Sequence, residues 1–157
     1  MGLKGRYFSE RDLALINSLN SELMDDIIQT EVVCFKMAPN QTNTNIYGES
    51  KPTEGKTFFP GLEIVAFIDR AEAEMQYDDF GPNRTQDVIF KFRENDLKNR
   101  NFYPETGDVI QFNARYYEVD NVVQEHLIGG QEDKSFSIVV HGHYSRISKL
   151  SMVERQT

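Results

Sequence analysis

Two histidines, His141 and His143, are the residues whose spacing most directly suggests chemistry. They lie two positions apart in a predicted strand, so both side chains project from the same face. Two imidazoles on one face can bind a metal ion, but a cupin-type site also needs a glutamate four or five residues later, and residues 144–149 contain none. We predict an exposed strand face without a catalytic metal. A β-barrel that binds a metal or a small ligand through the two histidines is the alternative.

Other catalytic signatures do not occur in the sequence. It contains neither a glycine-rich phosphate-binding loop nor a Gly-x-Ser-x-Gly nucleophile motif. The one cysteine, Cys34, has no cysteine partner and no neighbouring base that would activate it, so we predict a small buried hydrophobic residue on a strand. We therefore expect a protein that is not an enzyme, uses no cofactor and folds in a reducing cytosol.

The charge balance is acidic. The chain carries 25 acidic and 17 basic residues, with a formal net charge of -8, which argues against a protein that wraps nucleic acid with a basic face. The densest acidic stretch contains five acids and one base, and the acids are Asp69, Glu72, Glu74, Asp78 and Asp79. This stretch is either a solvated connection between strands or a functional surface, which repels DNA in a channel or docks a basic partner.

Length and composition suit one folded domain over residues 1–157. A chain of 157 residues with 39% hydrophobic and 27% charged residues is long enough to bury a sizeable core. No apolar run approaches the roughly 18 residues of a membrane helix, and no apolar segment follows the first six residues. We expect neither a membrane span nor a signal peptide.

The first element that can position these residues is an amphipathic helix over residues 8–29. Its apolar residues follow helical spacing, and they are Leu13, Ile16, Leu19 or Asn20, Leu23 and Ile27. Such a stripe must be buried against another surface. Packing on its own domain is the favoured interpretation, and packing on a neighbouring subunit is the alternative.

Strand patterns fill residues 31–150. Short alternating segments separated by turn signals predict a mainly β fold, either a small β-barrel or a sandwich, preceded by the one helix. The alternation assigns five side chains to the core, namely Phe90, Phe92, Ile110, Phe112 and Val119. Residues 151–157 are expected to form a tail.

A long polar segment, residues 38–57, interrupts the strands. Loops of this length inside a small domain are usually functional or disordered. Its apolar anchors are Ile46 and Tyr47, followed by Gly48, which can turn the chain, and Glu49. We predict an assembly arm that orders on a partner, and the alternative is a loop with no such role.

The order of these elements resembles the neck, or head-closure, proteins of contractile-tailed bacteriophages. The resemblance covers residues 10–150. It rests on the helix that leads into Val32-Val33-Cys34-Phe35 and on five later segments, which are Ile46-Tyr47-Gly48-Glu49-Ser50, Phe80-Gly81, the turn and strand of residues 104–112, Tyr117-Glu118-Val119 and Arg146-Ile147-Ser148-Lys149-Leu150.

The resemblance implies a non-enzymatic virion protein whose subunits form a homo-oligomeric ring, expected to be a hexamer. Such a ring extends the portal DNA channel, closes the filled head and docks the tail. Its partners would be the portal or adaptor complex and tail-terminator proteins, with packaged DNA passing through without specific binding and with no membrane contact. The protein would be assembled in the host cytoplasm and reside in the neck of the virion. A tail-terminator-type ring protein is the alternative.

Overall fold

The structure, a computed structural model, describes residues 10–39, 56–70, 74–78, 81–126, 135–146 and 150–152. The first described element is helix α1 (Glu10–Glu22), which continues into a π-helical turn, η1 (Leu23–Ile28). Gln29 ends the helix in the left-handed conformation, with its backbone N–H bonded to the carbonyl oxygen of Met24 at 2.9 Å. The predicted N-terminal helix is therefore confirmed over the described part of its range.

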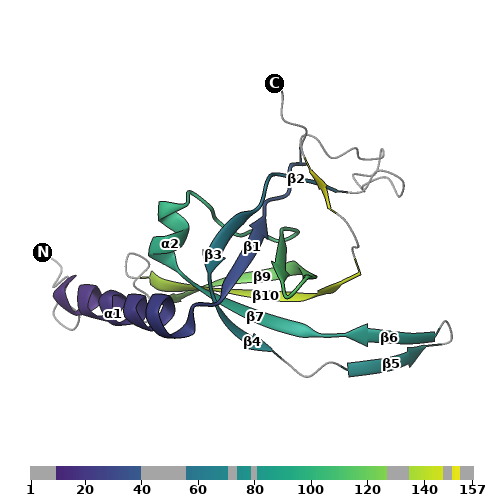
Figure 1. Ribbon diagram of the computed structural model, residues 1–157, viewed down its shortest axis with the longest axis horizontal. Helices are drawn as coiled ribbons and strands as arrows, with labels where there is room; N and C mark the ends of the chain where they lie inside the picture. The colour runs from purple at the N-terminus through teal and green to yellow at the C-terminus, as the bar shows by residue number, and fades with distance from the viewer. Residues whose placement is uncertain are drawn as a thin grey trace, which may run out of the picture.

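Seven strands form the main sheet, and every neighbouring pair is antiparallel. The order across the sheet is β3-β1-β8-β9-β10-β7-β4 (Figure 1). The strands are β1 (Glu31–Phe35), β3 (Leu62–Val65), β4 (Phe67–Arg70), β7 (Asp87–Arg93), β8 (Val109–Phe112), β9 (Arg115–His126) and β10 (Ser135–Ser145). The predicted mainly β fold is confirmed.

The predicted barrel is wrong, because the sheet is open between β3 and β4. These two outer strands are consecutive in the chain with only Ala66 between them, so they cannot pair side by side with each other. The first half of this stretch pairs with β1 and the second half pairs with β7. One extended segment therefore supplies both edges, and the sheet curls around a common core.

The core lies inside this curled sheet. Phe90, Phe92, Ile110 and Val119 are buried as predicted, and Phe112 is half-buried against them. The ring of Tyr117 meets that of Phe90 edge-on, with 5.7 Å between ring centroids. Further buried members come from the strands of the sheet and from α2 (Glu94–Asn99), and they include Val32, Cys34, Ile64, Ala66, Val88, Leu97, Phe102, Ile138 and Val140.

A second, smaller cluster covers the opposite face of β1 and β8. Phe35, Phe58, Val109 and Leu150 are its buried members. Phe58 lies in β2 (Thr57–Phe58), which pairs in parallel with β11 (Ser151–Met152). Residues 151 and 152, expected in a tail, thus belong to a short strand that follows the buried Leu150.

A two-stranded ribbon extends the sheet on one side. Strand β5 (Glu74–Asp78) pairs with β6 (Gly81–Thr85), and this antiparallel ribbon continues outward from β4 and β7 (Figure 1). An isolated two-stranded ribbon is marginally stable in water, since it lacks a third strand or a helix to pack against. The ribbon therefore needs a stabilising contact outside its own two strands.

The interior position of Phe90 gives the first testable prediction. Its side chain is fully buried, so Phe90→Ala should lower the free energy of unfolding by about 3–5 kcal/mol. Urea unfolding followed by circular dichroism measures the change. Phe67→Ala is the matched control, since that ring is 43% exposed and its loss should cost less than about 1 kcal/mol. Equal losses from both variants would contradict the inward assignment of Phe90.

The state of Cys34 gives the second prediction. Burial, together with the negative charge of Asp108, raises the pKa of this thiol to about 12. A raised pKa keeps the thiol protonated at neutral pH, and the protonated form is a poor nucleophile. A thiol reagent at pH 8 should therefore label the native protein at least tenfold more slowly than the urea-unfolded protein. Equal labelling rates would show that the thiol is accessible.

Candidate assembly surfaces

The root of the predicted assembly arm is a well-defined structure. Two backbone hydrogen bonds join residues 36–38 to residues 57–59: Ala38 donates to Thr57 at 2.8 Å, and Phe59 donates to Lys36 at 2.9 Å. Together they make Met37 and Phe58 antiparallel bridge partners. Residues 40–55 thus leave and return to the body at neighbouring points. Ile46, Tyr47, Gly48 and Glu49 themselves lie outside the described residues.

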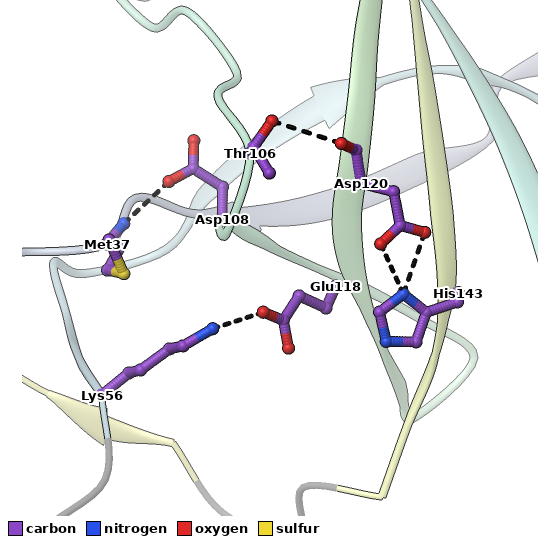
Figure 2. Close-up of polar contacts among 7 residues, drawn as sticks. All are labelled: Met37, Lys56, Thr106, Asp108, Glu118, Asp120 and His143. Carbon is purple, nitrogen blue, oxygen red and sulfur yellow. Dashed lines mark hydrogen bonds and ion pairs between the residues drawn. The ribbon is translucent and has the colours of Figure 1, made fainter. Parts of the chain in front are cut away.

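The Asp108 carboxylate fixes this root in place. It accepts a hydrogen bond of 2.9 Å from the backbone N–H of Met37 (Figure 2). It also accepts one of 2.8 Å from the backbone N–H of Glu105 and pairs with the Lys36 ammonium at 3.1 Å. Its side chain is only 3% exposed. A buried carboxylate with three donors is fully satisfied, so it locks the turn before β8 against the end of β1.

A second ion pair holds the returning end of the arm. The ammonium group of Lys56, directly before β2, contacts the carboxylate of Glu118 in β9 (Figure 2). Both side chains are partly exposed, so this pair contributes less to stability than the buried Asp108 contact. Both ends of residues 40–55 are therefore attached to β-structure.

The two histidines lie on the outer face of β10, but only His143 is exposed as predicted. His143 is exposed, and its Nδ1 lies 2.8 and 2.9 Å from the two carboxylate oxygens of Asp120 (Figure 2). His141 is half-buried and lines a hollow of about 450 Å³ together with Asp69, Arg70, Asp87 and Asp120. Among the described residues, no group of three or more His, Cys, Asp or Glu side chains is placed to hold a metal ion.

The acidic stretch spans the junction between the sheet and the ribbon. Asp69 is exposed at the end of β4. Glu74 and Asp78 lie in β5, opposite Thr85 and Gly81 of β6. Glu72 and Asp79 lie outside the described residues. The part of the stretch that can be followed is therefore ribbon and strand, rather than a plain connecting loop.

Packing of the predicted N-terminal stripe on its own domain holds for one part of the stripe and fails for the other. None of the thirteen residues of α1 is buried, and in η1 only Met24 is. Leu13 and Ile16 are half-buried, whereas four large aliphatic side chains remain exposed. These four, which we call the helix stripe, are Leu15 (59% exposed), Leu19 (56%), Leu23 (45%) and Ile27 (71%). The helix rests on its own domain without burying this stripe.

The helix is nevertheless firmly attached at its C-terminal end. Arg93 of β7 donates two hydrogen bonds of 3.0 Å to the Asp25 carboxylate and a third of 2.6 Å to Asp96. Burial disfavours the charge on Arg93, but the two carboxylates outweigh it and raise the pKa of the guanidinium further. Both bonds to Asp25 come from the same guanidinium nitrogen, Nη2, and they tie the C-terminal end of the helix to β7. Helix α1 projects from the sheet beyond this contact (Figure 1).

Sequence reasoning missed two of these features. The exposed Leu15 was not assigned to the stripe, because strict spacing placed Leu13 and Ile16 there instead. The Asp108 network was also missed, although Asp108 follows the turn residue Gly107, which has a φ of 94°. An aspartate directly after a glycine turn is the sequence signal for it, and its lysine partner, Lys36, directly follows β1.

Comparisons with known proteins leave the family open. No protein-family model matches the chain, and no curated protein is similar to it in sequence. Ten chains of solved structures match. One belongs to the structure titled "Virion of native gene transfer agent (GTA) particle", with a TM-score of 0.48, 8% sequence identity and coverage of 73% of this chain and 93% of that chain.

The described helices were also compared with the requirements of a membrane span. None of them combines the length and the apolar character that crossing a bilayer requires.

The Asp108 network yields the third prediction. Asp108→Ala should lower the free energy of unfolding by about 2–4 kcal/mol, because each part-buried N–H left without its acceptor costs about 1–3 kcal/mol. Thermal and urea unfolding measure the loss. Asp120→Ala serves as the control, because it removes an exposed carboxylate. Its free energy of unfolding should change by less than about 1 kcal/mol. A similar loss in both variants would show that Asp108 is not the structural centre of the root.

Proposed function

We propose that this protein is a structural subunit of a phage-type virion. Its place is the neck, where it forms a ring that extends the portal channel, closes the filled head and docks the tail. The observation that carries the proposal is the set of surfaces left unpartnered by a fold whose core is otherwise complete. The helix stripe is exposed over four large aliphatic residues, and the β5–β6 ribbon projects from the sheet.

Unpartnered apolar surface has a clear physical meaning in a protein with a complete core. Each large aliphatic side chain that passes from water into an interface contributes about 1.5–3 kcal/mol, so the helix stripe is a substantial source of binding free energy. Contiguous exposed apolar groups of this kind mark interaction sites on soluble proteins. A subunit whose role is assembly needs such surfaces, whereas an enzyme needs a cleft with catalytic side chains.

The charge of the chain supports a channel role. With a net charge of -8, it offers few groups that would neutralise DNA phosphates. Acidic residues also follow the junction of β4 with the ribbon, where Asp69 is exposed. A ring with acidic walls lets DNA pass without adhering, and an acidic ribbon can alternatively dock a basic partner. The resemblance of the sequence to head-closure proteins supports the first of these roles.

The rooted arm supports contact with neighbouring components. Residues 40–55 begin and end at a fixed root, so the segment can reach outward without disturbing the core. Ile46 and Tyr47 are the apolar anchors that such an arm would bury on another subunit. A tail-terminator-type ring protein is the second candidate function. Its subunits must also associate with one another, and they would use the same kind of surfaces.

The fourth prediction tests this function through the arm. Residues 40–54 are deleted and bridged with a short Gly-Ser linker, which the paired root can accommodate. We expect the thermal midpoint of unfolding to change by less than a few degrees, because the root contacts stay in place. Joining of tails to DNA-filled heads, measured by electron microscopy of particles supplied only with the variant, should fall at least tenfold.

A control variant separates the arm's contacts from its length. Replacing Ile46 and Tyr47 with serine keeps the length of the segment but removes the proposed anchors, so it should reproduce the defect. Replacing the nearby Thr42 and Thr44 with serine should leave head-to-tail joining intact. Normal joining by the deletion variant would overturn the arm, and a large loss of stability would show that residues 40–54 belong to the core.

A further inference from the structure

The outer face of the sheet carries an apolar row beside α1. Four residues are cross-strand neighbours from β4 to β9: Phe67 opposes Lys91, Lys91 opposes Val139, and Val139 opposes Val123. Directly opposed residues of neighbouring strands lie on the same face. This face points away from the core, because the adjacent residues Ile68, Phe90, Val122 and Val140 belong to the core cluster. We call these four residues the outer row.

The outer row is exposed at its two ends, whereas Val139 between them is only 7% exposed. Phe67 and Val123 are each 43% exposed and lie at its two ends. Lys91 lies between them, with its ammonium 5.9 Å from the centroid of the Phe67 ring. Lys91 makes no ion pair with any residue that the structure describes. The row therefore combines two exposed apolar ends with one available positive charge.

The helix stripe has the complementary character. It is convex and aliphatic, and it is accompanied by Glu22 and Asp26, which are both exposed and form no ion pair within the described part of the chain. The negative charges beside the aliphatic stripe match the positive charge of Lys91 beside the exposed Phe67 ring. The two surfaces are thus complementary in hydrophobicity and in charge.

The two surfaces lie beside each other on one molecule but do not cover each other. Leu23, Met24 and Ile28 border a hollow of about 170 Å³ whose opposite wall includes Phe67 and Lys91. The Arg93–Asp25 pair holds the helix at this end, so the stripe residues farther along α1 cannot fold onto the row of the same chain. The exposed stripe and the exposed ends of the row are therefore available to different molecules.

We propose that the helix stripe of one copy packs on the outer row of a second copy, with Glu22 or Asp26 placed against Lys91. A contact between two different surfaces is heterologous, and repeated heterologous contacts close into a ring when the rotation between neighbours permits. The inference deepens the proposed function. It rests on that function, because a neck ring requires identical subunits to associate. It identifies which surfaces form the contact.

The fifth prediction tests the contact by cross-linking in trans. Leu19→Cys and Val123→Cys are made in separate chains that carry different tags, mixed and oxidised. A disulfide between the two tags can then arise only from contact between molecules. Cys34 is buried and does not interfere. We expect the mixed disulfide to exceed that of a control mixture, in which Tyr103→Cys replaces Val123→Cys, by at least fivefold.

Charge reversal provides an independent test. Lys91→Glu alone, and Glu22→Lys with Asp26→Lys together, should each raise the concentration needed for association at least tenfold, as measured by analytical ultracentrifugation. Mixing the two variants should restore association, because the opposite charges again face each other. Lys98→Glu, an exposed change on α2, is the matched control and should leave association unchanged. Circular dichroism verifies that each variant is folded.

Several results would overturn the contact. A chain that remains monomeric at millimolar concentration, or one that associates without the Leu19–Val123 cross-link, has no such interface. Failure of the reversed pair to rescue association would also exclude the Lys91 contact. If Leu19→Asp particles still join heads to tails, the helix contact fails while the proposed function stands. If the cross-link forms but the wild-type chain never enters phage heads, the proposed function fails while the contact stands.

Discussion

One extended stretch of chain, residues 62–70, serves both outer edges of the sheet, and the rest of the structure depends on it. Ala66, at its midpoint, is fully buried, and its backbone N–H donates to Thr30 at 2.9 Å. A larger side chain at this position would meet the crowded interior, where the two halves of the sheet come together. The same contact brings the end of the N-terminal helix against the sheet, so the edge and the helix are positioned by one residue.

This arrangement also positions the surfaces for which we propose a role in assembly. The second half of the stretch pairs with β7, and from these two strands the ribbon extends. The other side of the molecule is organised by Asp108, whose three donors fix the root of the arm. Core packing and polar contacts thus have separate functions here. Packing determines how the sheet curls around its core, and the polar contacts determine where segments leave the body.

Much of the fold could be predicted from the sequence, because alternation is a local signal. The pattern around Phe90 and Phe92 marks an inward face whatever the partners of that strand are, and the helical spacing before residue 29 marks a helix. The topology could not be predicted in this way, since the pairing of β1 with β3 and β8 joins residues far apart in the chain. The exposure of Leu15 and Leu19 could not be predicted either, because the apolar spacing of a helix is the same whether its own domain or another molecule covers it. The candidate arm lies outside the described residues, so only its root has been placed.

The ribbon has a mechanical consequence. Strand β6 leads into β7 with only Gln86 between them, and the carbonyl of Gln86 accepts a hydrogen bond of 2.9 Å from Tyr144. A pull along the ribbon would therefore travel down a continuous backbone into a strand bonded on both sides, to β4 and to β10. Such a load acts parallel to the strands, so the hydrogen bonds of both ladders would share it rather than open one after another. Tension applied along β6 would thus pass into the two hydrogen-bonded ladders of β7 in the main sheet.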